Sequence, residues 1–120
     1  MKIISWNVNG LRAIHRKGNW EELLAYDADI IGIQETKAEA DQLPDKVRNP
    51  DGYHGYFYSS QERKGYAGVA MYSKTKPDDV TYGLPEQYGV ADTQGRTLTL
   101  HFPTHICITC LLYTSDAADE

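Results

Sequence analysis

Two short apolar runs, each ending in a cluster of polar residues, constrain the fold of this sequence more than any other feature. The first run covers residues 3–8, and the polar residues Asn7, Asn9 and Arg12 mark its end. The second covers residues 29–33 and leads directly into Gln-Glu-Thr-Lys at residues 34–37. Runs of this length that are rich in β-branched residues are typical of buried strands. Amide and charged groups are costly to bury without partners, so both clusters are expected at solvent-facing strand ends.

A helix is predicted between the two runs. Glu21 and Glu22 suit its first turn, where carboxylates favour the helix dipole, and Trp20, Leu23 and Leu24 form an apolar face. A strand, helix and strand in succession favour a right-handed crossover and a parallel pair. Both polar ends would then lie on one edge of a sheet, where open α/β sheets bind their ligands.

The rest of the chain predicts antiparallel strands. Residues 53–60 and 68–73 form one expected pair, and residues 80–82 a further segment. Residues 96–102 alternate strictly between polar and apolar side chains, and residues 105–109 follow as a hairpin partner. A parallel unit followed by antiparallel strands indicates a mixed sheet of the α+β class.

Composition limits the class of protein. A chain of 120 residues with 41% hydrophobic and 24% charged residues is at most one globular domain. No apolar run approaches the roughly 18 residues that span a bilayer, and no secretory signal is visible, so we expect a cytoplasmic monomer without a membrane partner. The net charge is -5, but three of the negative charges are Asp116, Asp119 and Glu120, while basic residues gather near the proposed site.

Glu35, with the amide oxygens of Asn7 and Asn9, suggests a magnesium site. Zinc prefers Cys and His, whereas Mg²⁺ takes one or two carboxylates and leaves other positions to water and phosphate. Arg12, Lys17 and Lys37 would then hold a phosphodiester backbone. The ordinary alternatives stay open: a glutamate at a strand end is more often a cap or surface group, and the basic residues could be scattered surface charge.

Two further motifs have simpler readings. Cys107 and Cys110 form a Cys-x-x-Cys, but residues three apart in a strand point to opposite faces, so we expect neither a zinc site nor a redox pair. Tyr66 lies between Gly65 and Gly68, where an aromatic ring could contact a nucleic-acid groove or simply pack on the sheet.

Three segments together resemble the exodeoxyribonuclease III type of apurinic/apyrimidinic endonuclease, within the endonuclease/exonuclease/phosphatase superfamily. They are Ser-Trp-Asn-Val-Asn-Gly-Leu-Arg-Ala at 5–13, Ile-Gly-Ile-Gln-Glu-Thr-Lys at 31–37 and Gly-Tyr-Ala-Gly-Val-Ala at 65–70. The resemblance runs over residues 1–109 and implies a four-layered αββα sandwich, of which this chain is the N-terminal half, one sheet with its covering helix. Residues 110–120 resemble translated sequencing-adapter sequence, and we interpret them as a non-family tail, an artefact of an incomplete gene model.

The resemblance assigns roles to individual residues. Glu35 matches the metal-binding glutamate of the family, and Asn7 the asparagine of the metal site. Asn9 occupies a position that is Asp in some members and Asn in others. The positions that match DNA contacts are Asn9, Arg12, Lys17, Lys37, Gly65 and Tyr66. The implied reaction is Mg²⁺-dependent hydrolysis of double-stranded DNA at abasic sites or 3′ ends. The implied activities are endonuclease, exonuclease and 3′-phosphatase, and Mn²⁺ is an alternative ion.

The sequence also departs from the family pattern. The catalytic tyrosine of the family aligns near Leu111, with Tyr113 out of register, and the later Asp, Asn and His blocks have no counterpart. We therefore expect no catalytic residue beyond the metal side, no nuclease activity of this chain alone, and poor folding because one sheet face stays exposed. A phosphatase or phospholipid hydrolase of the same superfamily, or a non-catalytic DNA-binding fragment, are the alternatives.

Overall fold

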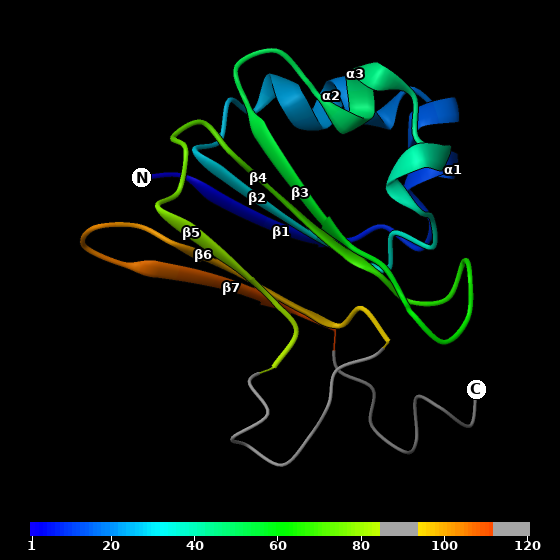
Figure 1. Ribbon diagram of the computed structural model, residues 1–120. Coiled ribbons are helices and arrows are strands. Elements are labelled where there is room, and N and C mark those ends of the chain that lie inside the picture. The colour runs from blue at the N-terminus through cyan, green and yellow to red at the C-terminus, as the bar shows by residue number, and fades with distance from the viewer. Residues whose placement is uncertain (85–93, 112–120) are drawn as a thin grey trace.

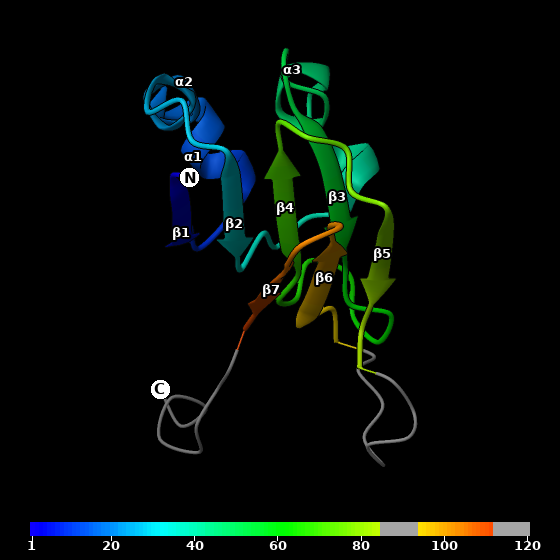
Figure 2. The same ribbon diagram turned by 90° about the vertical axis from the view of Figure 1, so that its left-hand side faces the viewer.

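The computed structural model of the protein describes residues 1–84 and 94–111, which form three layers (Figure 1). Helices cover the outer face of a four-stranded sheet, and a three-stranded sheet packs on its other face. Turned by 90° about the vertical axis, the same view shows the two sheets as separate groups of strands (Figure 2). In the described residues, one apolar cluster joins the helices to the four-stranded sheet and a second joins the two sheets.

The four-stranded sheet has the order β1-β2-β4-β3. Its strands are β1 (Ile3–Asn7), β2 (Ile30–Gln34), β3 (His54–Tyr58) and β4 (Val69–Ser73). The strands β1 and β2 are parallel, with Asn7 opposite Gln34, and β4 is antiparallel to both β2 and β3. This confirms the predicted strand–helix–strand unit and the antiparallel pair, and it places the polar ends of β1 and β2 on one edge.

Four short helical segments cover the outer face of this sheet. They are α1 (Leu11–Arg16), α2 (Asn19–Ala25), the 3₁₀ turn η1 (Ala40–Gln42) and α3 (Asp45–Arg48). Trp20 of α2 is buried beside Tyr72 of β4, with ring centroids 5.2 Å apart. Within the described ranges, no helix has the length and hydrophobicity to cross a bilayer.

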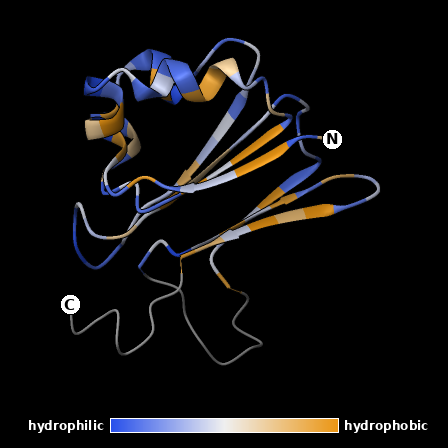
Figure 3. Cartoon of the chain, turned by 180° about the vertical axis from the view of Figure 1, so that it is seen from behind, coloured by the Kyte–Doolittle hydropathy of each residue, from blue (hydrophilic) through white to orange (hydrophobic). Residues whose placement is uncertain are grey.

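The three-stranded sheet corrects the expectation that this chain forms one sheet. Its strands β5 (Asp79–Tyr82), β6 (Thr97–His101) and β7 (Ile106–Cys110) are antiparallel in the order β5-β6-β7. They cannot join β4, because β2 and β3 occupy both edges of that strand. Leu98 and Leu100 of β6 are instead fully buried against Ile30 and Met71 of the first sheet. Figure 3 shows that the apolar residues concentrate in the strands of both sheets.

Exposed apolar side chains remain on the second sheet and on the edge strand β1, where Ile3 is 56% exposed. Ile106 and Ile108 of β7 are 56% and 58% exposed, whereas both faces of β2 and β4 are buried. The strand β7 runs through Cys110, and Leu111 packs into the core between the sheets. Residues 112–120, most of the predicted tail, lie outside the described part.

One polar side chain connects the two sheets. Gln34, the last residue of β2, donates from Nε2 to Ser5 Oγ of β1 at 3.0 Å and to Thr109 Oγ1 of β7 at 2.8 Å. Thr109 is 4% exposed, so this bond satisfies a polar group inside the layer between the sheets. Gln34 thus fixes how the second sheet lies over the first at the edge that carries the polar clusters.

Replacing Tyr72 by Phe tests the packing of the helices on the sheet. The Tyr72 hydroxyl is buried and donates to the backbone oxygen of Val47 at 2.9 Å, and burial raises the Tyr72 pKa above its ordinary value. Without the donor, the Val47 carbonyl stays buried and unpaired, so we expect Tyr72→Phe to lower the free energy of unfolding by about 1–3 kcal/mol. Urea denaturation measures this. Tyr26→Phe is the matched control, because Tyr26 is 62% exposed; an equal loss in both variants would contradict the assignment.

Candidate functional site

The candidate site is built on backbone hydrogen bonds that continue past the ends of β1, β2 and β4. On one side of residues 34–37, Val8 N, Gly10 N and Leu11 N donate to the carbonyls of Gln34, Glu35 and Thr36 at 2.9–3.0 Å. On the other side, Thr36 N and Lys37 N donate to Gly68 O at 3.0 Å and Ala67 O at 2.8 Å. Residues 34–37, hereafter the Glu35 segment, are therefore held between two neighbouring loops.

The backbone of these loops is strained. Asn9, Glu35, Lys37 and Ala67 have positive φ angles of 49°, 60°, 51° and 55°. Non-glycine residues rarely adopt this left-handed conformation, which costs roughly 1–3 kcal/mol each and gathers at functional sites. The hydrogen bonds on both sides of the Glu35 segment maintain this conformation, and four of the five described non-glycine residues with positive φ lie at this edge of the sheet.

Four of the predicted site residues are linked by side-chain contacts. Asn7 Oδ1 accepts from the backbone N–H of Asn9 at 3.1 Å, and Asn9 Oδ1 accepts from Lys37 Nζ at 2.6 Å. Lys37 Nζ also lies 3.5 Å from Glu35 Oε1, whose side chain is 16% exposed. Asn7 and Glu35 therefore lie at the same end of the paired strands β1 and β2, and their joint role as metal ligands stays a prediction.

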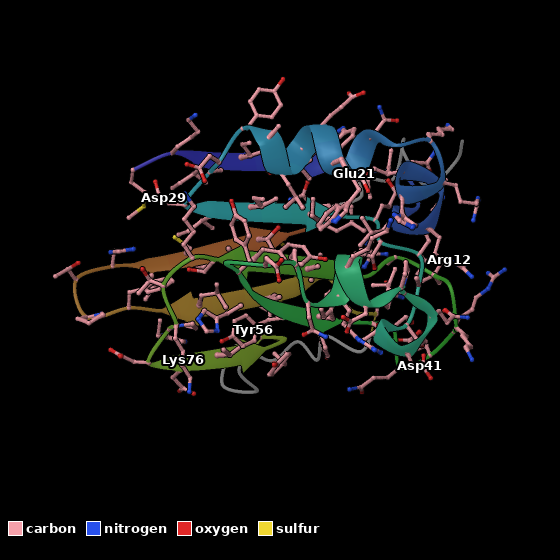
Figure 4. The ribbon with its side chains drawn as sticks, turned by 90° about the horizontal axis from the view of Figure 1, so that it is seen from above. Arg12, Glu21, Asp29, Asp41, Tyr56 and Lys76 are labelled. Atoms are coloured by element: carbon pink, nitrogen blue, oxygen red, sulfur yellow. The ribbon has the colours of Figure 1, made fainter. Side chains whose placement is uncertain are left out.

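Arg12 joins this group, whereas Lys17 does not. Arg12, in the first turn of α1, donates from Nη2 to the carbonyl of Lys37 at 3.1 Å. Figure 4 places Arg12 at one end of the molecule, with Asp29 and Lys76 at the opposite end. Lys17 is the C-cap of α1, and within the described chain its exposed side chain makes no hydrogen bond or ion pair. The structure therefore does not connect Lys17 to the site.

A pocket of about 310 Å³ connects the Glu35 segment to the predicted DNA-contacting turn. It is lined by Glu35, Lys37, Arg63, Lys64, Gly65, Tyr66 and Ala67. Three cationic side chains thus share this lining with one carboxylate, which favours anionic ligands. The pocket brings Gly65 and Tyr66 next to the proposed metal ligand Glu35.

Two arginines hold Tyr66: Arg63, which the sequence placed among the basic residues near the site, and Arg96, which the sequence did not connect with it. Arg96 donates from Nη2 to the Tyr66 hydroxyl at 3.1 Å, and its guanidinium carbon lies 5.8 Å from the ring centroid. Arg63 lies at the same distance from that centroid. These are cation–π distances. Arg96 precedes β6 and is 30 residues from Tyr66 in sequence, so no local pattern could have revealed the contact.

The oxygen donors of the site fit a hard divalent cation. Glu35 supplies a carboxylate, and Asn7 and Asn9 supply amide oxygens, a donor set that suits Mg²⁺ better than zinc. The ammonium of Lys37 already lies against Asn9 Oδ1 and Glu35 Oε1, so these oxygens do attract a cation. Across residues 1–84 and 94–111, no group of three or more His, Cys, Asp or Glu residues is placed to hold a metal.

Comparison with known proteins places this geometry in a family. The model of the Endonuclease/Exonuclease/phosphatase family matches residues 4–105. The chain is 42% identical over 118 residues to an exodeoxyribonuclease of Bacillus subtilis, covering 98% of this chain and 44% of that protein. It is 41% identical over 110 residues to DNA repair nuclease APEX1 of Danio rerio, covering 91% of this chain and 35% of that protein.

A solved structure agrees with these relatives. The 3′ phosphatase NExo from Neisseria, bound to a product DNA hairpin, superimposes with a TM-score of 0.72 at 34% identity, over 90% of this chain and 40% of that one. The chain belongs to the endonuclease/exonuclease/phosphatase family. Its relatives are exodeoxyribonucleases and apurinic/apyrimidinic endonucleases, which confirms the resemblance and the α+β class of the fold. The chain spans about 35–44% of the length of these two curated relatives.

Replacing Arg96 by Met tests whether this arginine holds the Tyr66 turn. Arg96 also donates to Gln94 Oε1 at 2.6 Å and to the carbonyl of Leu111 at 3.4 Å, so its loss removes three hydrogen bonds at once. We expect a decrease of roughly 1–3 kcal/mol in the free energy of unfolding, measured in urea. Arg16→Met, on the exposed end of α1, should change it by less than ~0.5 kcal/mol. Equal effects of the two substitutions would show that Arg96 has no special role.

Proposed function

We propose that this chain supplies the metal-binding and DNA-binding side of a DNA-repair nuclease of the exodeoxyribonuclease III type. The observation that carries the proposal is the series of contacts from Asn7 through Asn9 and Lys37 to Glu35, beside the pocket that contains Tyr66. A phosphodiester substrate requires cationic side chains that bind its phosphates, and this rim provides them together with an acidic metal ligand and an aromatic turn. Relatives named as exodeoxyribonuclease and DNA repair nuclease support this reading.

In this proposal Glu35 and Asn7 hold Mg²⁺, with Mn²⁺ as the alternative ion. The ion would neutralise charge that develops on the phosphate and on the leaving oxygen. Lys37 contacts Glu35 Oε1 and Asn9 Oδ1 in the structure, so its ammonium is placed to bind a phosphate oxygen next to them once a metal ion takes over those contacts. Arg12 supplies a second cation on the same rim.

Tyr66 would contact the DNA groove from the turn that starts at Gly65. Arg96 engages its hydroxyl and the two arginines flank its ring, so the phenol is oriented before DNA arrives. A fixed aromatic ring loses little conformational entropy on binding. The proposed substrate is double-stranded DNA with abasic sites or 3′ ends, acted on by a cytoplasmic monomer.

The chain alone should not cleave DNA. Glu35 is the single carboxylate in the described lining of the pocket, so no second carboxylate there can activate water while Glu35 binds metal. Incubation of the purified chain with an abasic duplex and Mg²⁺ should give no product above background. Cleavage above that of a Glu35→Ala control would contradict this expectation.

Duplex binding should depend on Arg12 and not on Lys76. Arg12→Ala removes one phosphate contact from the proposed rim, so we expect weaker binding and a salt dependence whose slope falls by about one unit. Lys76→Ala is the matched control, because this exposed lysine lies at the other end of the molecule (Figure 4). Fluorescence anisotropy with a labelled duplex at several salt concentrations measures both. Equal losses would indicate binding by net surface charge, and Mg²⁺-independent binding that survives Glu35→Ala would favour a non-catalytic DNA-binding role.

A further inference from the structure

Thr36 and Gly68 touch where the Glu35 segment meets the Tyr66 turn. Thr36 is 2% exposed, and it directly follows Glu35 in the sequence. Gly68 has a φ of +93°, and a Cβ atom built on it would lie 2.3 Å from Thr36 Oγ1. Real Cβ atoms do not approach other atoms so closely, so the backbone of Gly68 lies directly against the Thr36 hydroxyl.

This contact lies beyond the paired part of the strands. The ladder between β2 and β4 ends at Gln34 and Val69. Past that point, only Thr36 N to Gly68 O and Lys37 N to Ala67 O connect the two loops by backbone hydrogen bonds. Glu35, Lys37 and Ala67 all have positive φ here, a strained arrangement that persists only while neighbouring contacts hold it.

We propose that Thr36 and Gly68 are positioning residues that couple the metal side of the site to its DNA side. Their contact sets the separation of the two loops, so that the Glu35 carboxylate and the Tyr66 ring face the same pocket at once. Neither residue needs to touch metal or DNA. The part of this inference that concerns metal affinity rests on the proposed function, whereas the coupling of the loops does not.

Gly68→Ala breaks the contact, and the chain offers a control and a rescue. Gly52 has a similar φ of +84° with nothing within 4 Å of a built Cβ, so Gly52→Ala imposes the same backbone strain without a clash. Thr36→Ala removes Oγ1. The atoms then nearest to the new Cβ at position 68 are Thr36 Cβ at 3.6 Å and Lys37 N at 3.7 Å, which are ordinary contact distances.

Two measurements on the 120-residue chain read out the effect. Amide hydrogen exchange at Thr36 and Lys37 reports the bonds to Gly68 and Ala67 without any metal. Titration with Mn²⁺, followed by its electron paramagnetic resonance signal, reports affinity at Glu35. We expect Gly68→Ala to speed exchange at both amides about tenfold and to weaken Mn²⁺ binding about tenfold. The Thr36→Ala/Gly68→Ala double variant should return both to within about threefold of wild type, and Gly52→Ala should change neither.

Each result decides the inference. Unchanged exchange at Thr36 and Lys37 in Gly68→Ala, or failure of the double variant to restore it, would overturn the coupling. If wild type binds Mn²⁺ no better than Glu35→Ala, the proposed function fails. The exchange data still test whether the Thr36–Gly68 contact couples the two loops. If Gly68→Ala does not fold, Thr36→Ala alone removes the hydroxyl without a clash. Thr36→Ala should still speed amide exchange at Lys37 relative to wild type. An exchange rate at Lys37 equal to that of wild type would refute the proposal.

Discussion

The hydrogen bonds that extend the pairing of β1, β2 and β4 beyond their ends decide where every side chain of the site lies. Gly10 N binds Glu35 O on one side, and Thr36 N binds Gly68 O on the other. Loops held by such bonds behave as extensions of the sheet and not as free connections, since each backbone group has a defined partner. The backbone of the site is therefore held by hydrogen bonds of the same kind as those in the sheet, and these bonds maintain its strained residues.

Charge on this rim differs from charge on the whole chain. The net charge is -5, yet Arg12, Lys37, Arg63 and Lys64 gather around one carboxylate. A ligand that approaches this rim is exposed to a local positive potential with one carboxylate, that of Glu35. Such a surface can bind a metal ion at the carboxylate and a phosphate at the cationic side chains. The overall acidity therefore does not argue against a polyanionic ligand.

The sequence predicted the part of the site that depends on local order. Two apolar runs with polar ends, joined by a helix, lead by the default handedness to parallel strands, so Asn7 and Glu35 could be placed on one edge in advance. The role of Lys17 stays a prediction, because this exposed C-cap residue of α1 is not linked to the site by a hydrogen bond or ion pair within the described chain. The second sheet and the contact of Arg96 with Tyr66 could not be predicted, because alternation shows which face of a strand is apolar and not which strand covers it.

Gln34 makes the end of the sandwich that carries the site different from the other end. Its one amide nitrogen donates to hydroxyls on β1 and β7, so three strands from two layers meet at a single side chain. The bond to Ser5 holds the Gln34 side chain within its own sheet, and the bond to Thr109 ties that sheet to the other, so sliding of one layer over the other would break the bond to Thr109. The layers are thus joined by a polar contact at the end that carries the candidate site, and the turn that joins β6 to β7 lies at the other end of β7 from Thr109.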